Sequence, residues 1–254
     1  MMASVPGIIH RPSPNFGPRA DNRAPDMLLL HYTGMRTAQE ALARLCDPAA
    51  QVSAHYLIDE DGSLYKLVED DRRAWHAGVA HWEGDPDVNS RSIGIELVNP
   101  GHEFGYRPFP EPQIKRLIAL AHDLLARYPI APWHILGHSD VAPARKTDPG
   151  ELFPWARLAE EGIGLFPYVA DEAAHSLSDP MDAPCHETIT ELTDLLSGFG
   201  YGLPQKNQNS PGLEDIIRAA QRHWTPKTVT GVVNAPLLAI LRALCAIKAA
   251  APSA

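Results

Sequence analysis

The segment WHILGHSDVAPARKTDPGELFPW, residues 133–155, carries side chains that could perform metal-dependent chemistry. His138 follows a short apolar run, and Lys146 and Asp148 lie in the turn-rich stretch beyond it. Imidazole and carboxylate groups together are typical ligands of zinc or of a hard metal ion, and the lysine two residues before the carboxylate could act as an electrophile. The GHSD sequence alone could equally form a hydrogen-bonded loop. A functional metal site would need a third ligand and a base from elsewhere in the chain.

Two predicted strands earlier in the chain could supply these groups. Residues 27–30 form an apolar run, which predicts a buried strand, and a period of two places His31 on one face at its carboxyl end. Residues 93–98 (IGIELV) predict another strand, in which Glu96 lies on the face opposite the large apolar residues. A buried carboxylate there is costly unless it is paired or faces a wet cleft. We therefore favour a site role for Glu96 over a structural ion pair.

The surrounding pattern predicts the elements that position these residues. Residues 37–45 are typical of a helix with Thr37 as N-cap, and residues 52–58 and 63–68 indicate a hairpin around an acidic glycine turn. Residues 112–128 predict an amphipathic helix that covers a sheet. Strands separated by helices indicate an α/β domain with a mixed central β-sheet flanked by helices. We place this domain at residues 1–168, with an irregular, proline-rich lead-in at residues 3–25.

A second, smaller unit is predicted beyond this domain. Residues 169–184 are small, acidic and proline-containing, which predicts a linker. Three helical patterns follow, at residues 187–196, 213–224 and 236–249. They predict a small all-α three-helix domain over residues 185–254. This unit carries no cluster of catalytic residue types, so we expect a binding or docking module.

Composition excludes several classes of protein. The 22 basic and 31 acidic residues give a net charge of −9, which argues against a nucleic-acid partner. The 3 cysteines are widely spaced and predict neither a disulfide framework nor a metal-binding pair. The N-terminal residues lack the pattern of a secretory signal, and no apolar run predicts a membrane span. We expect a cytoplasmic protein, with the periplasm or envelope as the alternative if a signal has been removed.

Six motifs occur in order along the chain. They are HYT at 31–33, SAHYLI at 53–58, WHAG at 75–78, IGIEL at 93–97, GHSD at 137–140 and RKTDPG at 145–150. Together they make the chain resemble the zinc-dependent N-acetylmuramoyl-L-alanine amidases of the amidase-2 family, which is related to the peptidoglycan recognition proteins. More loosely, GFGYG, IIRAAQRHW and TGVVNAPLLAIL in the C-terminal region resemble a peptidoglycan-binding three-helix domain.

The resemblance implies a catalytic Zn²⁺ site. The implied ligands are His31, His138 and Asp148. Three protein ligands leave one tetrahedral position for water, as in catalytic zinc sites. His134 is the rival ligand that spacing allows, but the resemblance points only to the histidine of GHSD. Glu96 matches the family's acidic residue near the metal and would transfer protons, and Lys146 would stabilise the tetrahedral intermediate.

Several further residues are candidates for contact with the substrate. They are Arg145, Trp75, His76, Tyr32 and Asn99. Arg145 could bind a peptide carboxylate by a bidentate pair, or it could form an ion pair that stabilises its loop. Trp75 and His76 could line the groove or serve packing alone. The implied reaction is hydrolysis of the amide bond between N-acetylmuramic acid, or its 1,6-anhydro form, and L-alanine of the stem peptide.

Two settings compete for such an enzyme. A cytoplasmic enzyme of peptidoglycan recycling would cleave small anhydro-muropeptides. An envelope enzyme would cut polymeric murein, with the C-terminal module as its anchor. We favour recycling, because no signal sequence is visible. A muropeptide-recognition module without activity is disfavoured, because the three implied ligands, Glu96 and Lys146 are all present.

Overall fold

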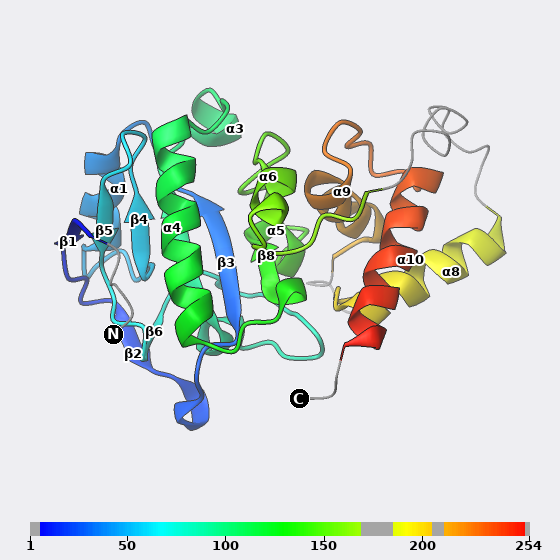
Figure 1. Cartoon of the computed structure of the whole chain (residues 1–254), viewed down its shortest axis with the longest axis horizontal. Helices are drawn as coiled ribbons and strands as arrows, with labels where there is room; N and C mark the ends of the chain where they lie inside the picture. Colours follow the sequence, from blue (N-terminus) through cyan, green and yellow to red (C-terminus); the bar gives the residue numbers. More distant parts are fainter. Residues whose placement is uncertain (1–5, 169–184, 205–210, 252–254) are drawn as a thin grey trace.

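The computed structural model describes residues 6–168, 185–204 and 211–251, and a six-stranded mixed sheet lies at its centre (Figure 1). The strand order is β1-β5-β4-β7-β3-β8, and all neighbours are parallel except β4 and β5, which form the predicted hairpin. The strands are β1 (Ile8–His10), β3 (Met27–Tyr32), β4 (Tyr56–Ile58), β5 (Leu64–Lys66), β7 (Ser92–Leu97) and β8 (Ile135–Gly137). The predicted fold class is therefore confirmed.

One face of the sheet is covered by a long amphipathic helix, α4 (Glu111–Arg127), as Figure 1 shows. Leu28 and Leu30 of β3 lie on this face with Ile93 and Ile95 of β7, because alternate residues of a strand share a face. They pack against the buried stripe of α4. That stripe contains Ile114, Leu117, Leu120, Ala121 and Leu124. The 3.6-residue period of the sequence thus predicts both the helix and its buried side.

The opposite face of the sheet is covered by two separate groups of residues. Helix α1 (Ala38–Leu45) packs against Leu57 of β4, and Thr37 caps this helix by accepting a hydrogen bond from the Glu40 amide at 3.2 Å. At the β3–β8 side, Met27, Leu29 and Leu136 pack against the C-terminal helices. Polar side chains of β3 and β7 share this face with the two apolar groups.

The N-terminal segment is more regular than its prolines suggested. Besides β1, it contributes β2 (Phe16–Pro18), which pairs with β6 (Arg72–Ala74), so the expectation of an irregular lead-in was wrong. Arg19, only 4% exposed, donates hydrogen bonds to backbone carbonyls of a distant loop, a short helix and a strand. The acceptors belong to Asp70, Asn89, Ser90 and Ser92. Proline is compatible with such a short edge strand, which is why composition alone misled.

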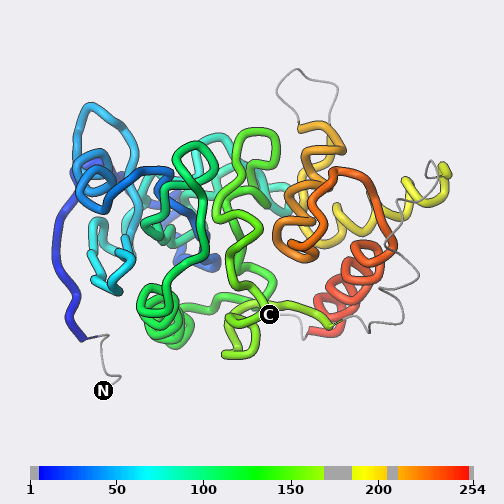
Figure 2. The backbone as a smooth tube through the Cα atoms, turned by 90° about the horizontal axis from the view of Figure 1, so that it is seen from above, coloured from blue at the N-terminus to red at the C-terminus, as the bar shows by residue number. Residues whose placement is uncertain are grey.

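Helices α8 (His186–Phe199), α9 (Leu213–Trp224) and α10 (Ala235–Ala250) confirm the three predicted C-terminal helices. Figures 1 and 2 show them grouped at one end of the molecule, and Figure 1 shows β8 on the side of the sheet that is next to them. Their buried residues form one continuous core with Met27, Leu29 and Leu136 of the sheet. The predicted linker, residues 169–184, lies outside the described residues, and the division into two domains stays a prediction.

Shorter helices complete the described structure. They are η1 (Ala20–Asn22), α2 (Val88–Arg91), α3 (Gly101–Phe104), η2 (Pro132–His134), α5 (His138–Val141) and α6 (Trp155–Glu160). Within the described ranges, no helix has the length and apolar character needed to cross a membrane. Of the short helices, α5 matters most for the site, because it directly follows β8 and begins with His138.

Candidate active site and metal centre

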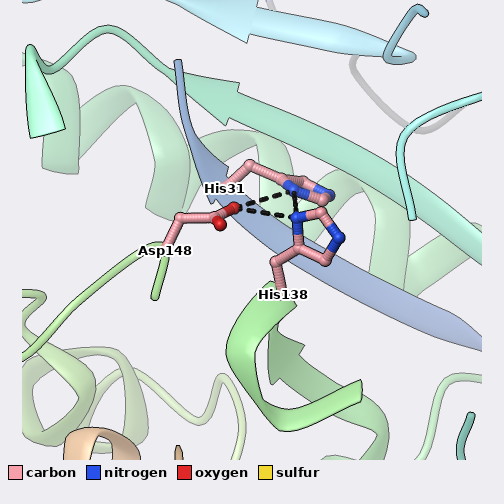
Figure 3. Close-up of side chains that lie close together, drawn as sticks. All are labelled: His31, His138 and Asp148. Carbon is pink, nitrogen blue, oxygen red and sulfur yellow. Dashed lines mark hydrogen bonds and ion pairs between the residues drawn. The ribbon is translucent and has the colours of Figure 1, made fainter. Parts of the chain in front are cut away.

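Three side chains from distant parts of the chain converge near the carboxyl end of β3 (Figure 3). His31 extends from β3, His138 is the first residue of α5, and Asp148 lies in the loop between α5 and α6. The Nδ1 atoms of the two histidines are 2.9 Å apart, and Asp148 Oδ2 lies 3.1 Å and 3.0 Å from them. All three residues are buried. The structure therefore brings together the three ligands that the resemblance implied.

Strand register explains much of this placement. In the parallel pairing of β3 with β7, His31 is directly opposite Glu96, so both side chains emerge on the same face. Strand β8 runs parallel on the other side of β3, and the chain passes from Gly137 straight into α5. A Cβ atom at position 137 would lie 2.7 Å from Cδ of Pro149, so glycine allows the close approach of the Asp148 loop.

The second ring nitrogen of each histidine has a partner of its own, which leaves Nδ1 available for a cation. His31 Nε2 donates to His76 Nδ1 at 3.0 Å, and His138 Nε2 donates to the Ala77 carbonyl at 3.0 Å. Burial, reinforced by the neighbouring His138, lowers the pKa of His31 to about 4. Burial raises the pKa of Asp148, but the contacts with both histidines hold it well below its usual range. Neutral imidazole and ionised carboxylate are the forms that bind zinc.

The donor set fits a zinc ion. It consists of two imidazole nitrogens and one carboxylate oxygen, 2.9–3.1 Å apart. Donors bound at about 2.0–2.1 Å to a tetrahedral ion lie about 3.3 Å from one another, so this spacing is close to the required one. The rival ligand His134 is directed elsewhere, with Nε2 2.8 Å from Glu83 Oε2 and Nδ1 3.0 Å from the Asp26 carbonyl oxygen.

Glu96 and Lys146 line the same cavity as the three clustered residues, and its volume is about 340 Å³. Glu96 Oε2 is buried and has no hydrogen-bond partner within the described part of the chain. Burial, together with the charge of Asp148, raises the pKa of Glu96 to about 8, and Lys146 opposes this shift. A bound cation would lower this pKa again. A carboxyl group of this kind, beside a cation site, is suited to accept and release a proton.

Three of the candidate substrate contacts line the cavity: Tyr32, His76 and Arg145. The Tyr32 hydroxyl is hydrogen-bonded to Thr147 Oγ1 at 2.9 Å, beside the Asp148 loop. The Arg145 guanidinium donates to the carbonyls of Ala77 and Val79. These bonds join the Arg145 loop to the segment that follows His76, and the described residues form no ion pair with Arg145. Binding of a peptide carboxylate by Arg145 stays a prediction.

Trp75 and Asn99 are not among the residues that line this cavity. Asn99 is fully buried. Its amide nitrogen donates to the Arg107 carbonyl at 2.7 Å, and its oxygen accepts from the Gly101 amide at 3.1 Å. Both ends of the Asn99 amide therefore hold the loop that follows β7. The half-buried Trp75 is hydrogen-bonded through its backbone amide to Ser53 Oγ at 2.9 Å.

His76 also supports the cluster, which sequence reasoning missed. Its ring lies against β7, where a Cβ atom at Gly94 would come within 2.5 Å of His76 Cγ. Since His76 Nδ1 accepts from His31, its Nε2 donates to Ser92 Oγ at 3.3 Å, and Ser92 in turn donates to the Val88 carbonyl at 2.7 Å. This chain of hydrogen bonds fixes the orientation of His31. The glycine inside an apolar strand was the available signal, because it often marks a close approach.

Comparison with known proteins agrees with this geometry. Residues 21–151 match the Amidase_2 model, N-acetylmuramoyl-L-alanine amidase. The chain is 37% identical over 237 residues to the N-acetylmuramoyl-L-alanine amidase AmiD of Escherichia coli, covering 86% of this chain and 81% of that protein. It is 36% identical over 166 residues to the 1,6-anhydro-N-acetylmuramyl-L-alanine amidase AmpD of Enterobacter cloacae, covering 59% of this chain and 87% of that one.

Solved structures show the same fold over nearly the whole chain. Escherichia coli AmiD, in complex with anhydro-N-acetylmuramic acid-L-Ala-D-γ-Glu-L-Lys, superposes with a TM-score of 0.76 at 34% identity and covers 89% of this chain and 90% of that one. AmpDh3 of Pseudomonas aeruginosa, in complex with anhydromuramic pentapeptide, gives a TM-score of 0.76 at 30% identity and covers 98% and 99%. By sequence and by fold, this chain belongs to the N-acetylmuramoyl-L-alanine amidase family.

Proposed function

We propose that this amidase binds Zn²⁺ through His31, His138 and Asp148 and hydrolyses the amide bond between N-acetylmuramic acid, or its 1,6-anhydro form, and L-alanine of the stem peptide. The observation that carries the proposal is the buried cluster of these three residues in the cavity that also contains Glu96. The solved AmiD and AmpDh3 complexes, with bound anhydro-muropeptides, support the substrate class.

The residues of the cavity divide the chemistry among them. A zinc ion in such a site lowers the pKa of bound water from about 15.7 to about 7 and polarises a carbonyl. Glu96 accepts the proton of the attacking water and returns it to the alanine nitrogen as the carbon–nitrogen bond breaks. Lys146 places a positive charge near the lactyl carbonyl oxygen, which becomes negative in the tetrahedral intermediate. Tyr32 and Arg145 line the cavity wall, so we expect both to approach the bound peptide. To bind a peptide carboxylate, Arg145 would exchange a hydrogen bond to the Ala77 or Val79 carbonyl for one to the substrate.

The biological setting that we propose is peptidoglycan recycling in the cytoplasm, with small anhydro-muropeptides as substrates. Its support is the match of the catalytic region to enzymes named for the 1,6-anhydro-N-acetylmuramyl-L-alanine bond. The second candidate is action on polymeric murein, with helices α8–α10 attaching the enzyme to the wall. Its support is the match to AmiD, which extends over 86% of the chain and therefore beyond the catalytic region.

Elemental analysis and two parallel digests test this proposal. We expect one zinc ion per chain and release of stem peptide with a free L-alanine amino terminus from anhydro-muropeptide, detected by mass spectrometry. His31→Ala is the matched variant, and it should lose both zinc and activity. Faster release from intact sacculi would favour the envelope enzyme, and fractionation of cells would then decide the compartment. A chain that binds muropeptide without releasing any product would be a recognition module.

A further inference from the structure

Asp140 lies two residues after His138 and is almost completely buried, with 1% of its surface exposed. Its carboxylate accepts three hydrogen bonds. Oδ2 accepts from the Gly137 amide at 2.8 Å and from His223 Nδ1 at 2.7 Å, and Oδ1 accepts from the Tyr201 hydroxyl at 2.6 Å. A buried carboxylate is tolerated only with such donors. Two of the three donors come from the C-terminal region.

These two donors are themselves held rigidly. The His223 ring is stacked between Trp155 and Trp224, with ring centroids 3.7 Å and 3.5 Å away. The Tyr201 hydroxyl accepts a hydrogen bond from Trp224 Nε1 at 3.1 Å. The Tyr201 ring meets Trp82 edge-on with centroids 5.0 Å apart. A donor pair with so little freedom can fix the position of the carboxylate that it binds.

Asp140 in turn fixes the turn that carries His138 and that is bonded to the backbone of Asp148. Its hydrogen bond to the Gly137 amide closes the first turn of α5 around His138. The amide of Ser139, inside the same turn, donates to the Asp148 carbonyl at 2.9 Å. A displacement of this turn would therefore move His138 and the backbone of Asp148 together.

We propose that Tyr201 and His223 are positioning residues of the metal centre. Acting through Asp140, they hold α5 in the place where His138 and Asp148 both face His31. The inference rests on the proposed zinc ligation by these residues. It gives the C-terminal region a part in zinc binding that is separate from any attachment to wall polymer, since Tyr201 and His223 of this region both donate to Asp140.

The test measures zinc affinity in the full-length chain, by competition with a chromogenic chelator, and the visible spectrum of the cobalt-substituted protein. His223→Leu keeps apolar bulk between the two tryptophans but removes the donor to Asp140. We expect it to lose about 10- to 100-fold in zinc affinity, as for partners that orient metal ligands, and to shift the cobalt spectrum. His223→Asn restores a nitrogen donor near the Nδ1 position, so it should recover most of the affinity. Tyr201→Phe should show a smaller loss.

Leu244→Ala is the matched control for loss of stability. Leu244 is fully buried in the same core, on α10, which supplies none of the three donors to Asp140. It should lower the thermal midpoint but leave zinc affinity and the cobalt spectrum unchanged. If His223→Leu binds zinc as tightly as the wild type, or if His223→Asn loses as much as His223→Leu, the positioning role is wrong. A wild-type chain that binds no zinc would instead overturn the proposed ligation.

Discussion

The two faces of the central sheet are built from the same strands but have opposite character. The face under α4 contains apolar side chains such as Leu28, Leu30 and Ile95. Their packing depends on shape and volume and requires no hydrogen-bond partner. The other face carries His31 and Glu96 between two apolar groups. His31 is oriented by the directed hydrogen bond from its Nε2 to His76, and Glu96 lines the cavity with an oxygen that has no partner among the described residues. Burial on the first face provides stability, whereas directed contacts on the second provide a reactive geometry. The two faces should therefore respond differently to substitution.

The strongest test of this difference is Glu96→Gln on the polar face. We expect the turnover number on anhydro-muropeptide to fall by about 10²- to 10⁴-fold, because the amide cannot take up the proton of water. Zinc content should stay at the wild-type value, since Glu96 is outside the His31–His138–Asp148 cluster. The free energy of unfolding should not decrease, because a buried carboxyl group whose charged form is penalised by burial becomes a neutral amide of the same shape. Near wild-type turnover would show that another group is the base.

The apolar face is tested by Leu120→Ala on α4. Leu120 is fully buried between this helix and the sheet. Its truncation should therefore lower the free energy of unfolding by about 2–5 kcal/mol in urea titrations. Turnover measured well below the thermal midpoint should be unchanged. Ile118→Ala, at a partly buried position of the same helix, is the control and should cost less. If Leu120→Ala lost zinc while remaining folded, the two faces would not be independent.

The same contrast explains what the sequence could predict. Helix α4 was expected at residues 112–128 and lies at Glu111–Arg127, because the helical period of its apolar residues is a local signal. The alternation of side chains along each strand likewise predicted the face on which His31 and Glu96 lie. The ordered motifs then indicated the three clustered residues.

Hydrogen bonds between residues that are distant in the sequence leave no comparable signal in the sequence pattern. Asp140 meets Tyr201 and His223 across 61 and 83 residues, and Arg19 reaches the strand at Ser92 across 73 residues. A hydrogen bond between such residues produces no periodicity, so neither could be predicted. The C-terminal helices were predicted correctly, but their participation in the core of the sheet was not.

Stability measured as a function of pH tests the directed contacts of Glu83, which joins Lys248 of α10 to the rest of the chain. Apolar burial does not depend on pH in this way. Burial raises the pKa of Glu83, but contacts with His134 and Lys248 lower it to about 2 from 4.5. The folded-state pKa is depressed, so the contribution of Glu83 is complete above pH 4.5 and is lost as the pH falls toward 2. In urea unfolding, wild type should exceed Glu83→Gln by about 1–2 kcal/mol at pH 6, after allowance for solvent screening. A difference that persists at pH 2.5 would contradict this assignment.

The smallest effect is expected for Lys248→Ala, at the edge of the same boundary. Lys248 Nζ donates to Glu83 Oε1 at 2.6 Å and to the Phe199 carbonyl at 2.7 Å, with its side chain 24% exposed. Because the pair is partly exposed, the free energy of unfolding should fall by only about 0.5–1 kcal/mol. A double-mutant cycle with Glu83→Gln should assign most of this loss to the Lys248–Glu83 pair. Zinc affinity should not change, since Lys248 donates neither to Asp140 nor to His31, His138 or Asp148, the proposed ligands. A drop in zinc affinity would mean that general docking of α10, and not the donors to Asp140, maintains the metal centre.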